Sequence, residues 1–137
     1  MFSYPQGIAH SPNGVLYVTD YYNNAVRRVT TSGEVQTFPN QGPDVSILAN
    51  TMLNPTGITF AGDTMWVLSS NANNYSGANT TNISTMGPQD KGPSTRFVEE
   101  NYGTFQYIAG GADGSVYMSL FQAVYKWPFA QASQPFV

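Results

Sequence analysis

The amino-acid sequence predicts an all-β fold, a partial β-propeller of about three four-stranded blades, on three observations. An isoleucine recurs at equal spacing, at Ile8, Ile58 and Ile108, and an aromatic residue follows each of them on the next expected strand. Each copy joins a short strand to a strand that is apolar at nearly every position, through a turn rich in Asn, Asp and Gly. No helical apolar period interrupts this pattern. Strands without polar alternation are buried on both faces, so the sequence predicts small sheets stacked side by side.

The first copy contains a full set of expected strands. They cover residues 4–9, 15–20, 25–30 and 34–38, and the turns between them contain Asn13-Gly14 and Ser32-Gly33. Asn and Gly accept the positive φ that tight hairpin turns require. Four strands in roughly forty residues are typical of one propeller blade.

The other two copies are expected to follow the same order. In the second copy the expected strands are 54–60, 65–69, 83–86 and 95–98, with an insertion over 71–82. In the third copy they are 105–109, 116–119 and 123–127, and residues 134–137 begin or supply an outer strand. The chain is therefore predicted to be one propeller segment, 1–137, with blade one over about 4–47, blade two over about 53–100 and blade three over about 104–137.

Three blades are too few to close a ring, because propellers have typically four to eight. The two end sheets would then expose apolar faces that favour association. Two copies of the chain would complete a six-bladed ring, and two-fold dimers are the commonest oligomers, so the first expectation is a homodimer. A different partner chain, a longer propeller of which this chain is a fragment, and an open arc in a larger assembly are the alternatives.

Composition narrows the classes of partner. The net charge is −3, only 9% of residues are charged, and the five basic residues are scattered apart from Arg27-Arg28. Nucleic acids and anionic membrane surfaces need clustered Lys and Arg, so neither is expected as a partner. The sequence lacks the roughly 18 consecutive apolar residues of a membrane-spanning helix, has no cysteine, and does not begin like a signal peptide. Its polar, weakly charged composition favours an extracellular or virion location.

The first copy resembles an NHL repeat. The residues that carry the resemblance are Pro5-Gln6-Gly7-Ile8-Ala9, Leu16-Tyr17-Val18-Thr19-Asp20 and Asn23-Asn24-Ala25-Val26, which are similar to the P-x-G-I-A, VYV-x-D and NN-x-V segments of NHL and SMP-30-like propellers. The second copy keeps Pro55, Gly57 and Ile58 but has serine in place of the aspartate, and the third keeps Ile108 alone of these. Kelch repeats are the second choice, on Gly110-Gly111 and the length of the repeat.

The loops after the second strand of each copy are expected on one face of the propeller, where aromatic rings beside amides suit carbohydrate. The candidate ligand residues are Tyr21, Tyr22, Asn23, Asn24, Asn73, Tyr75, Phe121 and Gln122. The competing interpretation is turn chemistry, since Asp and Asn bond their own backbone in tight turns. The resemblance to NHL repeats favours that structural role for Asp20 and the Asn pair.

The SMP-30 resemblance implies an alternative function, a metal-dependent hydrolase or a related propeller lyase. Its Ca²⁺ would be held by oxygen ligands, for which Asp20, Asn23, Asn71 and Asn73 are the candidates. The first strands of the copies carry no carboxylate toward the expected channel, which argues against this reading. Glu99 and Glu100 are expected to be a solvated pair on a linker.

The remaining polar features are weak signals. His10 is the only histidine and has no catalytic partner in the sequence, so a half-buried strand-end position is expected. Of Arg27 and Arg28, which must point to opposite faces of a strand, one is expected to lie between blades and to pair with an acid such as Asp20. Three glycosylation sequons begin at Asn74, Asn79 and Asn82 in the insertion of copy two.

The sequence therefore favours a non-catalytic interaction or assembly module, with carbohydrate binding as its most specific form. The supporting features are the small number of titratable groups and the rigid loop-bearing scaffold that a propeller provides. No cofactor is expected under this interpretation, and Ca²⁺ is expected under the enzyme alternative.

Overall fold

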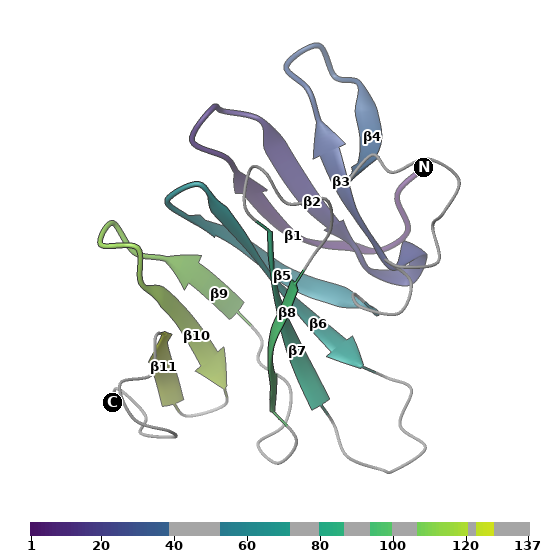
Figure 1. The fold of residues 1–137 in the computed structure, drawn as a ribbon. Helices are drawn as coiled ribbons and strands as arrows, with labels where there is room; N and C mark the ends of the chain where they lie inside the picture. The colour runs from purple at the N-terminus through teal and green to yellow at the C-terminus, as the bar shows by residue number, and fades with distance from the viewer. Residues whose placement is uncertain (39–52, 72–79, 87–93, 100–106, 121–122, 128–137) are drawn as a thin grey trace.

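The computed structural model describes residues 1–38, 53–71, 80–86, 94–99, 107–120 and 123–127, and they form three antiparallel sheets (Figure 1). Blade one contains β1 (Pro5–His10), β2 (Leu16–Asp20), β3 (Ala25–Val29) and β4 (Val35–Phe38), with a 3₁₀ turn η1 (Tyr21–Asn23) after β2. Blade two contains β5 (Pro55–Ala61), β6 (Thr64–Asn71), β7 (Thr80–Met86) and β8 (Ser94–Glu99). The described strands of blade three are β9 (Tyr107–Gly110), β10 (Val116–Leu120) and β11 (Ala123–Trp127).

Each sheet is a meander in which consecutive strands pair, so the all-β partial propeller predicted from the sequence is confirmed. The first hairpin of blade one and that of blade three turn at glycines with the same conformation, φ 76° at Gly14 and φ 79° at Gly114. Residues with a Cβ rarely adopt this region, which explains the Asn/Asp-Gly turns at these places.

Some boundaries differ from those expected. β6 continues to Asn71 and β7 begins at Thr80, so the segment between them is shorter than the insertion predicted over 71–82. The paired register of β6 and β7 runs from Met65 opposite Met86 to Asn71 opposite Thr80, which shows that pairing extends beyond the apolar residues. Glu99 is the last residue of β8 and does not lie on a linker, while Glu100 and the expected strand 134–137 lie outside the described residues.

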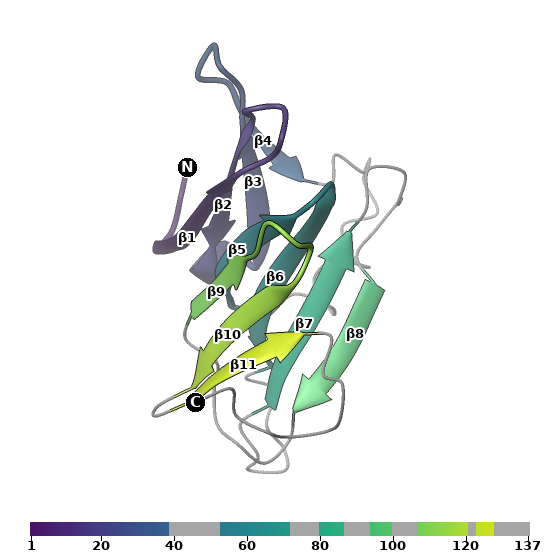
Figure 2. The same ribbon diagram turned by 90° about the vertical axis from the view of Figure 1, so that its left-hand side faces the viewer.

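The three blades lie side by side with blade two in the middle (Figures 1 and 2). In blades two and three, we call the face that packs against the preceding blade in the chain the leading face. In blade one, the leading face is the one that carries the equivalent side chains. The opposite face of each blade is its trailing face. The first junction packs the trailing face of blade one against the leading face of blade two. Its buried side chains are Val26 from blade one and Ile58, Met65, Val67 and Met86 from blade two.

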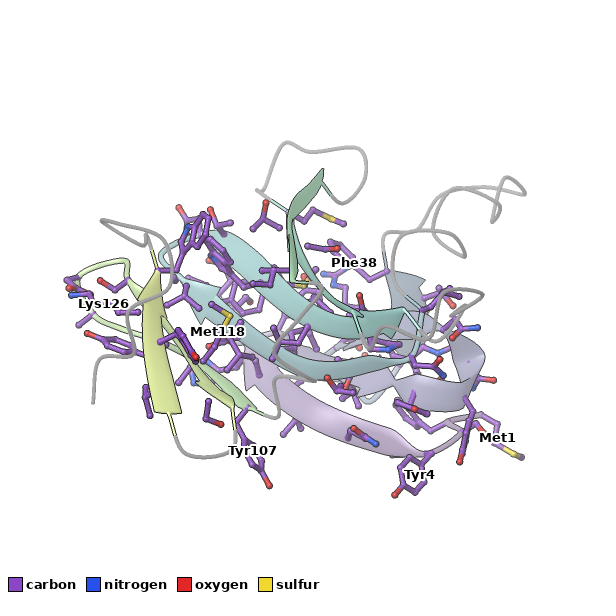
Figure 3. The ribbon with its side chains drawn as sticks, turned by 90° about the horizontal axis from the view of Figure 1, so that it is seen from below. Met1, Tyr4, Phe38, Tyr107, Met118 and Lys126 are labelled. Carbon is purple, nitrogen blue, oxygen red and sulfur yellow. The ribbon has the colours of Figure 1, made fainter. Side chains whose placement is uncertain are left out.

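The second junction repeats this arrangement one blade further on. Its buried core consists of Ala61, Leu68 and Ile83 from the trailing face of blade two and Val116 and Met118 from the leading face of blade three. Figure 3 shows Met118 directed into the space between these blades. Blade two is therefore covered on both faces, which accounts for the nearly continuous apolar sequence of β6.

No helix in the described part of the chain has the length and apolar character needed to cross a bilayer.

Candidate functional site

Three tyrosine rings meet at one end of blade one, and we call Tyr4, Tyr21 and Tyr22 the tyrosine cluster. Tyr4 precedes β1, and the other two lie in η1. The ring centroids are 5.8 Å apart for Tyr4 and Tyr21, 5.3 Å for Tyr4 and Tyr22, and 5.0 Å for Tyr21 and Tyr22. The side chains of Tyr4 and Tyr22 are 59% and 64% exposed. The cluster is thus an aromatic platform that solvent can reach, and Figure 3 shows Tyr4 pointing away from the blades.

The backbone of Tyr4 has a conformation that tyrosine rarely adopts. Its φ is 58°, in the left-handed region, and the corresponding residue before β5, Asn54, has φ 49°. Asparagine tolerates this region, whereas a bulky side chain there costs roughly 1–2 kcal/mol. Tyr4 is held there by its carbonyl, which accepts a hydrogen bond from the Tyr21 amide at 3.3 Å. The structure therefore keeps a strained tyrosine at the surface, where its ring completes the tyrosine cluster.

Asp20 directly precedes η1 in the chain, and its side chain is fully buried. Its carboxylate accepts hydrogen bonds from the Ser3 amide at 2.6 Å, from Asn23 Nδ2 at 2.8 Å and from Arg27 Nε at 2.7 Å. Burial raises the pKa of Asp20, but these three donors outweigh it and hold the pKa below its ordinary value. Asp20 is therefore a charged anchor for the N-terminal segment and η1, the structural role that the resemblance to NHL repeats implied.

The two adjacent arginines have separate roles. Arg27 pairs with Asp20 on the leading face of blade one, as expected, and also donates to Thr37 Oγ1. Arg28 lies on the trailing face opposite Tyr17 and lines a cavity of about 160 Å³ between blades one and two. The expectation that one arginine would both pair with an acid and lie between blades was wrong. The alternation of side chains along β3 divides the two roles.

The asparagine pair joins η1 to the N-terminal residues and to blade two. Asn23 Nδ2 donates to the Met1 carbonyl as well as to Asp20, while its Oδ1 accepts no hydrogen bond from the described residues. Asn24 has φ 50°, and its Oδ1 accepts a hydrogen bond from the amide of Asn54 at 2.9 Å. Asn24 is thus a joint between two blades, whereas Asn23 presents an acceptor beside the tyrosine cluster.

The structure brings together only the part of the predicted ligand set that lies in blade one. Tyr21, Tyr22, Asn23 and Asn24 are contiguous there, and Tyr4, which was not among the expected ligand residues, joins them. The equivalence of Tyr4 with Asn54, fifty residues later, was the available signal. The predicted ligand residues Asn73, Tyr75, Phe121 and Gln122, and the sequons at Asn74 and Asn79, lie outside the described residues. Asn71 ends β6, and the third sequon residue, Asn82, lies within β7 and not in a loop.

Among the described residues there is no group of three or more His, Cys, Asp or Glu side chains that could hold a metal ion. Asp20 and Asn23 from the expected Ca²⁺ set are neighbours, but the Asp20 oxygens bond to Ser3, Asn23 and Arg27. His10 ends β1 and is exposed, so the expected half-buried position was wrong. Its Nδ1 lies 3.2 Å from the Ser11 carbonyl.

A second candidate surface is the part of the leading face of blade one on which apolar side chains of β1 and β2 are exposed. In the β1–β2 register Ile8 lies opposite Val18 and His10 lies opposite Leu16. Ile8 is 65% exposed and Leu16 40% exposed. A hollow of about 320 Å³ opens beside Ile8 and Val18, with the apolar side chains of Phe2 and Pro5 on its wall. An exposed apolar sheet face of this kind indicates an interaction surface.

The family model of the NHL repeat matches residues 2–29, which include β1, β2 and β3. No curated protein matches the sequence.

Solved structures with the same fold include several propeller enzymes. A streptogramin B lyase has 22% sequence identity and a TM-score of 0.63 over 89% of this chain and 36% of its own. A catalytically inactive virginiamycin B lyase from Staphylococcus aureus with quinupristin has 19% identity and a TM-score of 0.66 over 97% of this chain and 41% of its own. The PQQ-bound aldose sugar dehydrogenase from Streptomyces coelicolor has 18% identity and a TM-score of 0.59, over 88% of this chain and 38% of its own. These likenesses establish the propeller fold, of which the chain spans less than half the length found in these proteins.

Proposed function

Because this chain carries an NHL repeat in an arc of β-propeller blades, we propose that it is a non-catalytic interaction module that binds carbohydrate through the tyrosine cluster. The observation that carries the proposal is the strained, exposed Tyr4. A left-handed tyrosine is unfavourable for folding, and its ring is too exposed to repay that cost by burial. Its contribution is to the aromatic surface.

The chemistry of the cluster suits a sugar. Exposed aromatic rings stack against the C–H face of a pyranose, and tyrosine hydroxyls and a neighbouring amide supply hydrogen bonds to sugar hydroxyls. Asn23 Oδ1, which no described residue engages, is one such acceptor. The buried Asp20 supports the platform and takes no part in proton transfer, because its carboxylate already binds three donors.

Binding to a glycan array that carries glucose, galactose, mannose and N-acetylglucosamine oligosaccharides tests this proposal, followed by titration of the best sugar. The informative variant is Tyr4→Asn, which places at this position the residue type found at Asn54. We expect it to fold at least as stably as the wild type and to weaken sugar binding at least tenfold. Tyr22→Ala should weaken binding similarly, whereas Val124→Ala, at an exposed residue of blade three, should not.

The proposal fails if no sugar on the array binds, or if Tyr4→Asn and Tyr22→Ala bind as the wild type does. Circular dichroism spectra and thermal midpoints establish whether each variant is folded, so that a loss of binding is not confused with a loss of structure.

The second candidate function is a metal-dependent hydrolase or a propeller lyase, favoured by the lyases among the structures of similar fold. It requires Ca²⁺ or another divalent ion at oxygen ligands, for which Asp20, Asn23 and Asn71 are the candidates. Elemental analysis of the purified protein separates the two functions, because the interaction module needs no bound metal. A stoichiometric divalent ion, together with turnover of a lactone or of quinupristin, would favour the enzyme.

A further inference from the structure

We propose that the leading face of blade one docks a further propeller blade of the same repeat type, and that Tyr107 prevents blade three of a second copy from occupying this place. The partner is a blade that these residues do not contain. It would precede blade one in the order of the ring.

The leading faces of the three blades carry apolar side chains at equivalent positions. By strand register, Leu16 in blade one corresponds to Met65 in blade two and Val116 in blade three. The last two are 3% and 0% exposed because a preceding blade covers them, whereas Leu16 is 40% exposed. Likewise Ile58 is 5% exposed, and its counterpart Ile8 is 65% exposed. Blade one therefore presents the same kind of apolar surface that the other two blades bury against a neighbour.

A preceding blade must have a residue without a side chain where its innermost strand meets the next blade. At each junction the innermost strand of the preceding blade carries a glycine, Gly7 in blade one and Gly57 in blade two. A Cβ on Gly7 would lie 2.8 Å from the Thr56 carbonyl oxygen, and one on Gly57 would lie 3.0 Å from Ile108 Cγ2. The absence of a side chain is what lets the next inner strand approach so closely.

Blade three breaks this pattern on its trailing face. Tyr107 pairs with Ser119 as Gly57 pairs with Leu68, so Tyr107 occupies the glycine position. Its side chain is 73% exposed, and Figure 3 shows it directed away from the described strands. A blade packed on this face in the register of the other junctions would meet the tyrosine ring. Blade three of a second copy would have to dock on blade one through this face to continue the ring.

The second feature expected of the partner blade is an aromatic residue that packs across the junction. At the first junction Tyr17 of the preceding blade packs on Phe60, with ring centroids 5.3 Å apart. At the second junction Trp66 packs on Trp127, with centroids 6.2 Å apart. A blade that fits blade one thus carries glycine on its first strand and an aromatic residue on its second, which would lie over His10 and Val29, the counterparts of Phe60 and Trp127. Blade three has the aromatic residue, Tyr117, but lacks the glycine.

The substitution Tyr107→Gly supplies the missing feature, so this variant of the chain is the probe. Light scattering coupled to size exclusion should give the wild type the mass of one 14.9 kDa chain. Tyr107→Gly should raise the mass to two or more chains, because blade three can then dock on blade one of another copy. Adding Ile8→Asp should return the double variant to one chain, and Tyr107→Phe, which retains the ring, should stay at one.

Two results would overturn the proposal. The first is a wild-type dimer that Ile8→Asp dissociates, since a second copy would then dock despite Tyr107. The second is a Tyr107→Gly variant that remains a single chain while its circular dichroism spectrum matches that of the wild type. The sugar-binding test uses other residues, so failure of one proposal leaves the other standing.

Discussion

The leading faces of blades one and two are built from matching residues and differ in what covers them. In blade two, Ile58, Met65 and Val67 lie in a junction core with 5%, 3% and 1% of their surface exposed. In blade one, Ile8 and Leu16 at the matching positions face solvent, with 65% and 40% exposed. The same sequence pattern therefore produces a core in one blade and an open surface in the other.

This difference shows that a repeat determines which residues form an apolar face, while its neighbours determine whether that face is stabilising. Burial of an apolar side chain contributes to folding only where a partner removes it from water. Each blade depends on the blade beside it, as in other repeat architectures.

The largest expected effect comes from truncating Ile58 and Ile8 in separate variants. Ile58→Ala should destabilise the protein by about 3 kcal/mol, because it removes buried methyl groups and leaves a cavity at the first junction. Ile8→Ala, at the matching exposed position, should change the free energy of unfolding by less than about 0.5 kcal/mol. Urea denaturation followed by circular dichroism measures both. Equal losses would mean that the leading face of blade one is covered in solution.

A smaller effect is expected at the end of the leading face of blade one where the buried Asp20 pairs with Arg27. Asp20→Asn should cost about 2 kcal/mol at neutral pH, since it leaves the partly buried guanidinium of Arg27 without its anion. Because the pKa of Asp20 is lowered on folding from 3.8, the carboxylate stabilises the protein above that pH, and this contribution is lost as the pH falls below it.

Denaturation at a series of pH values between 7 and 2 therefore distinguishes the two proteins. The difference between wild type and Asp20→Asn should be full at pH 7 and shrink as the pH falls below the ordinary value of 3.8. A constant difference would show that the charge of Asp20 does not contribute.

The smallest expected effect concerns the trailing faces of blades one and three. Gly7→Ala should destabilise by about 1 kcal/mol, because the new Cβ would lie 2.8 Å from the backbone oxygen of Thr56 and push the inner strands apart. Tyr107→Ala, at the equivalent position of blade three, should leave the thermal midpoint unchanged. A loss at Tyr107 as large as that at Gly7 would indicate that blade three is packed on that side as well.

The fold could be predicted from the sequence because each repeat consists of apolar segments as long as a strand, separated by turn residues. The spacing of Ile8, Ile58 and Ile108 and the glycine turns determine the strands, and apolar continuity in β6 indicates a sheet covered twice. Propeller architecture follows from these local features.

The candidate site was predicted less completely, because its decisive feature is a backbone conformation. Nothing in its residue type indicates that Tyr4 would adopt φ 58° and turn its ring onto Tyr21 and Tyr22. The separate roles of Arg27 and Arg28 depend on which face of β3 is covered, and that is a property of the packed blades. The residues expected from copies two and three lie outside the described segments, so their part in a site stays a prediction.

Tyr21 lies in both the aromatic platform and the first junction, since its carbonyl accepts a hydrogen bond from Asn54 Nδ2 at 3.4 Å and its ring stacks in the cluster. We therefore expect the proposed sugar binding at the tyrosine cluster to be coupled to the contact between blades one and two. A sugar that favours the present position of Tyr21 would stabilise that contact, and by reciprocity a tighter contact would raise the affinity for the sugar by the same free energy.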